Sequence, residues 1–319
     1  MSANPALSSI SEVIKISKIV VVGSLNFDTS IHVPHLPAKG ETIIASHLSL
    51  HHGGKGANQA VAIARLGGQV SFIGAVGNDE NGHQLINGLK KAGVDTTGIA
   101  IKDNAHTGMA FVCVAHSGEN NIIVYPGTNY RITKEDIDRN RPLITDADYC
   151  LLQLEIPFEI VRYVIGICHE AKVKVVLNPA PVSADFDDRI LAHVDYILPN
   201  ETELAMMVGE SVTMENIGKL ASSLLAKGCG HAIVTLGENG SFLVDPVRQE
   251  HFPAVKVKAV DTTAAGDSFI GAFTYRLASG DRIDEAIRFA TKAAAITVTR
   301  HGAQDALPSL EEVKNWLVS

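Results

Sequence analysis

The stretch Asp261-Thr-Thr-Ala-Ala-Gly-Asp267 decides the interpretation of this chain, because it sets small residues where a loop turns into a helix. The spacing of three apolar residues behind it predicts a helix over residues 268–278 that buries one face. The first N–H groups of such a helix lack partners and lie at the positive end of its dipole, so an anion can approach the backbone. Asp267 is then either a helix cap or a base that takes a proton from a hydroxyl beside a phosphoryl group.

The composition is that of a globular protein and argues against two kinds of partner. The 319 residues are 46% hydrophobic and 19% charged, which suits one large α/β domain with a smaller appendage. The net charge of −8 comes without any lysine- or arginine-rich run, so we expect no nucleic acid and no membrane as partner. The four cysteines show neither zinc nor disulfide spacing, which favours a reducing, cytoplasmic location.

Alternating strand and helix patterns predict the main architecture. Apolar, β-branched runs indicate buried strands at residues 18–23, 70–75, 149–153, 173–178, 195–199 and 231–235, with helices such as 79–92 and 158–171 between them. Repeated βα units predict a doubly wound, mostly parallel sheet with helices on both faces. Residues 17–319 should form this domain, and residues 1–16 a flexible N-terminal extension.

Two alternating segments predict a small β lid outside this sheet. They cover about residues 29–50, with short strands at 30–33 and 41–45, and about residues 108–125. We expect antiparallel strands there. Because exposed strands pair readily with another copy, the lid also predicts a homodimer.

Candidate ligand-binding residues follow the first strand and the first glycine-rich turn. Asn26 and Asp28 point the same way if the backbone is extended, which suits neighbouring hydroxyl groups; the alternative is an Asx turn. Gly53-Gly-Lys-Gly-Ala-Asn58 sets three glycines beside Lys55, which predicts close approach of a ligand to the backbone or, alternatively, a flexible turn. The run is not a Walker A loop, because glycine follows the lysine.

Further polar groups follow the later strands. Glu155 comes after the strand at 149–153. Asn200 and Glu203 can share one face of an opening helix, which suits a hydrated Mg²⁺ or, equally, a capping box. The turn Thr235-Leu-Gly-Glu-Asn-Gly240, which precedes a further expected strand at 241–244, is either an ordinary hairpin or a turn that packs against a nucleotide.

In this order, the segments 53–58, 200–203 and 261–267 resemble the paired signatures of the ribokinase family of carbohydrate kinases. The resemblance extends over roughly residues 17–317 and implies the doubly wound sheet with a β lid. It also implies ATP, Mg²⁺ and a monovalent cation, K⁺, as cofactors. From the resemblance we expect an ATP-dependent sugar kinase that phosphorylates D-ribose at O5 and releases ADP.

Carried over residue by residue, the resemblance implies a role for each candidate position. Catalysis falls to Asp267 as general base and to backbone N–H groups of Ala264, Ala265, Gly266 and Asp267. Sugar binding falls to Asn26, Asp28, Gly54, Lys55, Gly56, Ala57, Asn58, Glu155 and Asp267. Nucleotide binding falls to Thr235, Leu236, Gly237, Glu238, Asn239, Gly240, Gly266 and Thr291, with Asn200 and Glu203 holding Mg²⁺ through water. The ligands implied for the monovalent cation are Asp261, Thr263, Thr297, Arg300, Gly302 and Ala306.

One departure and three alternatives accompany the resemblance. Many relatives carry glycine at the position of Ala264, so the alanine is harmless only if its φ stays negative. A kinase of the same family could act on 2-deoxyribose, a ketohexose or a nucleoside. A dehydrogenase is disfavoured because no G-x-G-x-x-G follows the first strand. A non-catalytic sugar-binding regulator is disfavoured because Asp267, Gly266, Asn200 and Glu203 are all present.

Overall fold

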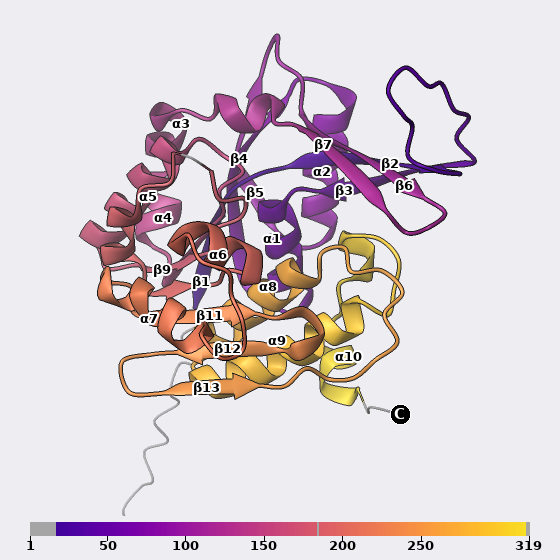
Figure 1. The fold of residues 1–319 in the computed structure, drawn as a ribbon. Coiled ribbons are helices and arrows are strands. Elements are labelled where there is room, and N and C mark those ends of the chain that lie inside the picture. The colour runs from indigo at the N-terminus through magenta and orange to yellow at the C-terminus, as the bar shows by residue number, and fades with distance from the viewer. Residues whose placement is uncertain (1–16, 184, 317–319) are drawn as a thin grey trace, which may run out of the picture.

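The structure is a computed structural model that describes residues 17–183 and 185–316. The expected extension over residues 1–16 therefore lies outside the described residues. The described chain forms a nine-stranded sheet with helices on both faces and a separate four-stranded sheet, the lid, that projects from one side (Figure 1). Among the helices of this part of the chain, none has the length and hydrophobicity needed to span a membrane.

The main sheet consists of the strands that the apolar runs predicted, together with two strands that they did not, β5 and β13. Its strands run in the order β13-β12-β11-β10-β9-β8-β1-β4-β5. Their bounds are β1 (Lys18–Val22), β4 (Gln69–Gly77), β5 (Asp95–Lys102), β8 (Tyr149–Leu152), β9 (Lys174–Leu177), β10 (Tyr196–Ile197), β11 (His231–Thr235), β12 (Ser241–Val244) and β13 (Gln249–Phe252). Neighbouring strands are parallel except along β11-β12-β13. The mostly parallel sheet is thus confirmed, and β1 lies where the strand order reverses, the place at which such sheets bind ligands.

Alternation along β1 divides the core into two clusters. Ile19 and Val21 belong to one, Val20 and Val22 to the other. The first face is covered by α1 (Lys55–Arg65), α2 (Glu80–Lys91), α8 (Ala265–Ala278), α9 (Ile283–Thr297) and α10 (Leu310–Asn315). The second is covered by α3 (Lys134–Arg139), α4 (Arg141–Thr145), α5 (Phe158–Ala171), α6 (Glu201–Val208), α7 (Ile217–Ala226) and the 3-10 helix η2 (Asp188–His193). Three further short 3-10 helices lie in the connections: η1 (Gly127–Arg131), η3 (Gly237–Asn239) and η4 (Gln304–Ala306).

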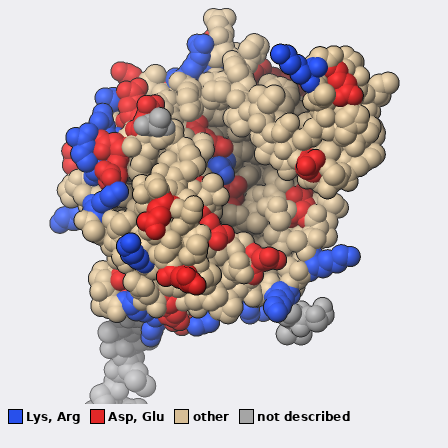
Figure 2. Space-filling view, in the orientation of Figure 1, with Lys and Arg blue, Asp and Glu red and all other residues tan. Residues whose placement is uncertain are grey.

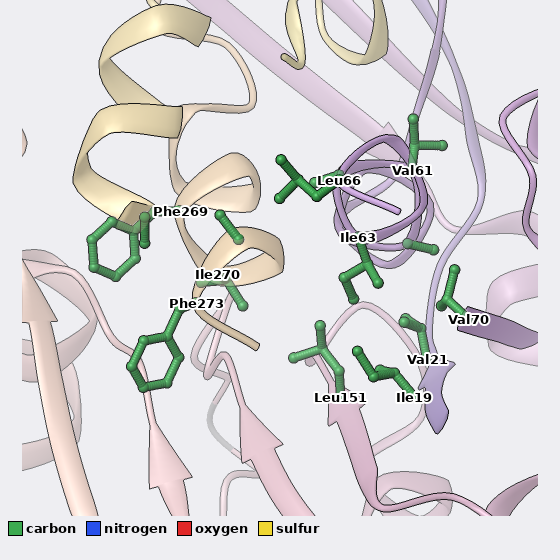
Figure 3. Packing of buried hydrophobic residues seen from close by; sticks show 14 of the residues in the cluster. Ile19, Val21, Val61, Ile63, Leu66, Val70, Leu151, Phe269, Ile270 and Phe273 are labelled. Atoms are coloured by element: carbon green, nitrogen blue, oxygen red, sulfur yellow. The ribbon is translucent and has the colours of Figure 1, made fainter. Parts of the chain in front are cut away.

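Helices α1 and α8 pack closely against each other on the first face. Figure 3 shows Ile63 of α1, Leu66 directly after this helix and Ile270 of α8 above Ile19 and Val21 of β1. Glycine at position 271 permits this approach, because a Cβ there would lie 2.6 Å from the Cβ of Ala62. The packing brings the amino-terminal turns of α1 and α8 to the same edge of the sheet.

The lid differs from its prediction in two respects. Its strands are β3 (His47–Gly53), β2 (Asn26–Val33), β6 (Gly108–Ala115) and β7 (Asn120–Tyr125), in that order. The sheet is mixed, because β2 pairs parallel to β6 and antiparallel to β3. The expected strand at 41–45 is wrong: the Glu41 carboxylate accepts a hydrogen bond from the Ala38 amide at 2.8 Å and closes a turn, so pairing with β2 begins only at His47.

Candidate active site

Polar residues lie side by side along the carboxyl edge of the main sheet. Gln153 follows β8, Asn178 follows β9, Asn200 follows β10 and Thr235 ends β11. These four strands are consecutive and parallel, so the residues share one edge. Figure 2 shows a hollow between the α/β body and the lid, with acidic and basic side chains inside it.

Asp267 stands at the amino terminus of α8, which begins at Ala265 rather than at 268 as predicted. Its side chain is 8% exposed and does not cap the helix. Instead, Oδ2 accepts a hydrogen bond from Asn58 Nδ2 and Oδ1 accepts one from Gln59 Nε2, both at 2.9 Å. The alternative of a simple helix cap is therefore excluded.

Asp267 shares its surroundings with one ammonium and other carboxylates. Burial raises the pKa of Asp267, while the charge of Lys55 and the two amide donors act to lower it. Burial would lower the pKa of Lys55, yet attraction to Asp267, Glu155 and Glu203 leaves that pKa raised, so the ammonium stays charged. The lysine thus offsets part of the repulsion among three carboxylates.

The backbone N–H groups from Ala264 to Asp267 were expected to form an anion hole, and one of these donors is not available. The N–H of Ala265 donates to Thr262 O at 3.2 Å, so this donor is already occupied. The N–H groups of Gly266 and Asp267 have no acceptor within residues 17–183 and 185–316. Ala264 adopts φ +58° and ψ +11°, so the condition of a negative φ is not met and the alanine is mildly strained.

Asn26 and Asp28 lie on lid strand β2 in extended conformation, which excludes the Asx turn. Asp28 Oδ1 is buried and has no hydrogen-bond partner in the described chain. Burial, and then the charges of Glu155 and Asp267, raises the pKa of Asp28 to about 7. The carboxylate presses against the backbone of the paired strand, since a Cβ at Gly53 would lie 2.0 Å from Oδ2.

The glycines around Lys55 are explained by contacts within the chain itself. Gly54 has φ +89°, and a Cβ there would lie 2.8 Å from Asn26 N. A Cβ at Gly56 would lie 2.7 Å from Ser24 N. Helix α1 begins at Lys55, which rules out a flexible turn. The glycines let α1 start directly against the segment between β1 and β2.

Glu155 secures the same junction from the other side. Its Oε2 accepts hydrogen bonds from Ser24 Oγ at 2.5 Å and from Lys55 N at 3.0 Å. A carboxylate at a helix amino terminus is favourable because of the free N–H groups and the dipole. The structure thus brings Glu155 to the start of α1, where Asn58 is one turn away from it.

Two cavities meet at the amino terminus of α8. The smaller, of about 230 Å³, is polar and includes Lys55, Asn200, Glu203 and Asp267. The larger, of about 830 Å³, lies between the turn at 237–240, residues 254–257 and α9, with Thr291 in its wall. Both cavities include Thr235, Thr262, Ala265 and Gly266. A ligand in the larger cavity could therefore extend its charged end past Gly266 to Asp267.

Asn200 and Glu203 form the capping box that the sequence left open as an alternative. Asn200 Oδ1 accepts from Glu203 N at 2.8 Å, and Glu203 Oε2 accepts from Asn200 N at 2.9 Å. Burial raises the pKa of Glu203 despite the hydrogen bond from Asn200. Both residues also line the smaller cavity, so capping the helix directs them toward it.

The residues expected around a monovalent cation are partly brought together. Asp261 Oδ1 accepts from Thr263 N at 2.9 Å, and Oδ2 accepts from Gly302 N at 3.0 Å. Burial acts to raise the pKa of Asp261, but these hydrogen bonds keep that pKa below its usual value. The Arg300 guanidinium points to Glu312, at 2.5 Å. The Thr297 hydroxyl, which has a single proton, lies 3.0 Å from the acceptor Ala293 O and 2.8 Å from the Ser268 hydroxyl. Ala306 lies in η4.

Sequence reasoning missed several residues of the site. Asn129 donates from Nδ2 to Asn26 Oδ1 at 2.8 Å and to Leu25 O at 3.1 Å, and accepts from Leu25 N at 2.9 Å. Ser24, Gln153 and Asn178 belong to the same buried polar region. A signal existed for the last two, since each is the final residue of a predicted strand, at its carboxyl end. Nothing local marked Asn129.

A buried carboxylate at a helix amino terminus, beside a cavity of nucleotide size, fits a phosphotransferase with an alcohol group as acceptor. Comparison with known proteins agrees. The pfkB family of carbohydrate kinases matches residues 16–310. The chain is 40% identical over 300 residues to the ribokinase of Haemophilus influenzae, with 94% of this chain and 98% of the relative covered. It is 36% identical over 301 residues to the deoxyribokinase of Salmonella typhimurium, with 94% and 98% covered.

The fold comparison gives the same result. The structure of Arabidopsis thaliana ribokinase complexed with ribose and ATP is 32% identical, with a TM-score of 0.87 and 93% of this chain and 97% of that chain covered. The chain therefore belongs to the pfkB family of carbohydrate kinases. Within this family, the ribokinases and the deoxyribokinase named above are similar to this chain over nearly their full length.

Proposed function

We propose that this protein transfers the γ-phosphoryl group of ATP to O5 of D-ribose. The observation that carries the proposal is the position of Asp267, at the start of α8, where the polar cavity meets the larger one. ATP in the larger cavity would direct its phosphates to Gly266, and a sugar beside Asn26, Asp28 and Asn58 would reach the same point from the lid. The relatives named ribokinase support this choice of substrate.

In the proposed reaction, Asp267 accepts the proton of the O5 hydroxyl while O5 bonds to the γ-phosphorus. The bond from that phosphorus to the bridging oxygen breaks, and its electron pair leaves with ADP. The free N–H groups of Gly266 and Asp267, with the dipole of α8, would stabilise the negative charge of the transferring group. Ala264 and Ala265 shape this turn.

Mg²⁺ fits this site through water rather than by direct ligation. Asn200 and Glu203 already use oxygens in the capping box, and each retains lone pairs that can accept hydrogen bonds from metal-bound water. Bound there with ATP, Mg²⁺ would neutralise phosphate charge. Thr235, Leu236, Gly237, Glu238, Asn239, Gly240 and Thr291 would surround the nucleotide.

A K⁺ ion would bind beside the loop that leads into α8. We propose Asp261, Thr263 and the carbonyls of Thr297, Arg300, Gly302 and Ala306 as its ligands. Asp261 already ties this loop to Gly302, so the ion would reinforce an existing contact and hold the anion hole in shape. Activity should then be higher in K⁺ than in Na⁺, and Asp261→Asn should reduce that difference.

The second candidate substrate is 2-deoxyribose, because a deoxyribokinase is 36% identical to this chain. Asn26 and Asp28 favour ribose, since two polar side chains on one face of β2 suit adjacent ring hydroxyls. Loss of one hydroxyl would leave a buried polar group unpaired, which strongly disfavours the wrong sugar.

The deciding experiment is an ADP-release assay with Mg·ATP and D-ribose, 2-deoxyribose, fructose or adenosine, each in K⁺ and in Na⁺. The proposal expects the highest kcat/KM for D-ribose. A higher value for another member of the panel would change the substrate and keep the phosphoryl transfer. Binding of a sugar without any ADP release would instead identify a sugar-binding regulator.

We also propose that the protein is a homodimer formed through the lid. Residues 17–319 would form one domain with the lid as its appendage, and the protein would act in the cytoplasm. One face of the lid exposes a patch of large apolar side chains, Leu48, Leu50, Phe111, Ile123 and Tyr125, while Ile122 and Val124 are exposed on the opposite face. Such a patch is unusual on a monomer. Sedimentation of the wild type and of Ile123→Glu tests the dimer, which the substitution should dissociate. The four free thiols suit a reducing compartment.

A further inference from the structure

A chain of buried amide side chains leads to the carboxylate of Asp267. Gln59 Nε2 donates to Asp267 Oδ1 at 2.9 Å and to Asn178 Oδ1 at 3.2 Å. Gln59 Oε1 accepts from Gln153 Nε2 at 2.6 Å. Gln59 and Gln153 are 0% exposed, so water cannot replace either of them.

The partners of each amide fix its orientation. Asn178 Nδ2 donates to Leu198 O at 3.0 Å, which turns its carbonyl oxygen toward Gln59. Gln153 presents its NH₂ group to the carbonyl oxygen of Gln59. Rotating the Gln59 amide by half a turn would set its oxygen against a carboxylate and a carbonyl at once. Only the NH₂ group of Gln59 can therefore face Asp267.

This arrangement costs stability elsewhere in the fold. Gln153 Oε1 is buried and has no hydrogen-bond partner among the described residues. The chain also keeps glycine at position 23, where a Cβ would lie 2.0 Å from this oxygen. A buried acceptor without a partner destabilises a protein, so its presence calls for another role.

We propose that Gln59, oriented by Gln153 and Asn178, is a positioning residue that holds the Asp267 carboxylate in its ionised, reactive geometry. The inference rests on the proposed role of Asp267 as general base. Gln59 itself lines neither cavity, so it acts only through Asp267. The second oxygen, Oδ2, is held by Asn58, and the two donors together prevent the carboxylate from rotating.

Other charged groups also act on Asp267 and must stay constant in a test. They are Lys55 at the start of α1, Glu155 after β8, Asp28 on β2 and Glu203 on α6. Substitutions in the amide chain leave all four in place. A change in the behaviour of Asp267 can then be assigned to the lost donor.

The test compares Gln59→Met and Gln153→Leu with the wild type. The pKa of Asp267 is followed by carbon-13 NMR of its carboxyl group, assigned by the signal that Asp267→Asn lacks. In Gln59→Met, loss of the donor should raise this pKa by about one unit; in Gln153→Leu, which keeps the donor but removes one of the groups that orient it, the pKa should rise by less. The acid limb of the kcat profile, measured at saturating sugar so that titration of Asp28 does not contribute, should move to higher pH by the same amount. Titration calorimetry with ADP counts the functional nucleotide-binding sites in each preparation. Calculated per such site, kcat should fall about tenfold, while the KM values for the sugar and for ATP stay within about twofold of the wild type.

Gln153→Leu separates positioning from stability. It removes one unpaired buried oxygen and leaves another, on Gln59, so the melting temperature should change little while the pH profile moves. Thr274→Val is the matched control, because it removes a buried hydroxyl from α8 without touching the amide chain. It should leave the pKa and the pH profile unchanged.

Two results would overturn the inference. One is an unmoved Asp267 pKa in both variants; the other is an activity loss that follows the melting temperature alone. A wild type that phosphorylates no sugar would refute the proposed function, and the NMR titration would still decide whether the amide chain controls Asp267. If Gln59→Met does not fold, Gln153→Leu decides the question by itself.

Discussion

Asp267 at the carboxyl edge of the main sheet and Asp28 on lid strand β2 both have a pKa raised by burial, but the chain binds them differently. Both oxygens of Asp267 accept hydrogen bonds from fixed amides. Asp28 has a buried oxygen with no partner, and its pKa rises to about 7. The difference suggests a division of labour: the base is set before the substrate arrives, and the lid carboxylate keeps its capacity for a ligand.

The largest expected effect comes from removing the preset base. Asp267→Asn should lower kcat by at least about 100-fold, because the O5 proton loses its acceptor. The KM for ATP should stay within about twofold, since the nucleotide cavity is untouched. Steady-state ADP release measures both constants. An unchanged kcat would show that Asp267 is not the general base, and the contrast between Asp267 and Asp28 would then have no basis.

The lid carboxylate should affect binding rather than chemistry. Asp28→Asn should raise the KM for the sugar about 10- to 100-fold, because hydrogen bonds to a charged acceptor are lost. Its kcat at saturating sugar should fall much less than that of Asp267→Asn. Initial rates over a sugar concentration series give the result. Equal losses of kcat in the two variants would contradict the division of labour.

The pH dependence sharpens the same contrast. A pKa of about 7 means that Asp28 is protonated below neutral pH, so the sugar KM of the wild type should rise as the pH falls below about 7. The folded state binds this proton more tightly than the unfolded state, so stability should fall as the pH rises from about 4 to about 7. Asp28→Asn should lack both dependences. Rates and melting temperatures at several pH values measure them.

Asn129 offers a weaker test of how the lid is held. Asn129→Ala frees the Asn26 amide and leaves both backbone groups of Leu25 without their partner. We expect a destabilisation of about 1–3 kcal/mol and a sugar KM raised roughly tenfold. Asn140→Ala removes an amide bound to the Asp136 carbonyl, remote from the lid. This control should lower stability without changing the sugar KM.

The smallest effect concerns the turn before α8. Ala264→Gly relieves a left-handed conformation that costs about 1 kcal/mol, and the greater freedom of glycine in the unfolded chain offsets much of that gain. The free energy of unfolding should therefore change by less than about 1 kcal/mol. Ala265→Gly, within the helix, should only destabilise. Urea titration of both variants distinguishes them.

Much of the fold could be predicted because its signals are local. The helix expected over residues 158–171 has those bounds in α5, and the apolar runs gave most of the parallel strands. The periodicity of the apolar residues and the positions at which the predicted strands end also indicated that polar residues gather at one edge of the sheet. The lid was predicted less well: the turn closed by Glu41 moved a strand, and β2 pairs with β6 in parallel.

The sequence by itself determined the α/β class, the helix beginning near Asp267 and the kinds of polar group available at the strand ends, because periodicity and turn residues act over a few positions. Only the tertiary structure decided which groups meet. Gln59 and Asp267 are 208 residues apart in the chain, yet they form one hydrogen bond in the core. The free oxygen of Asp28 and the amide orientations likewise depend on side chains brought together from distant segments. No local pattern encodes such contacts, since they arise only when α1, α8 and the sheet pack together.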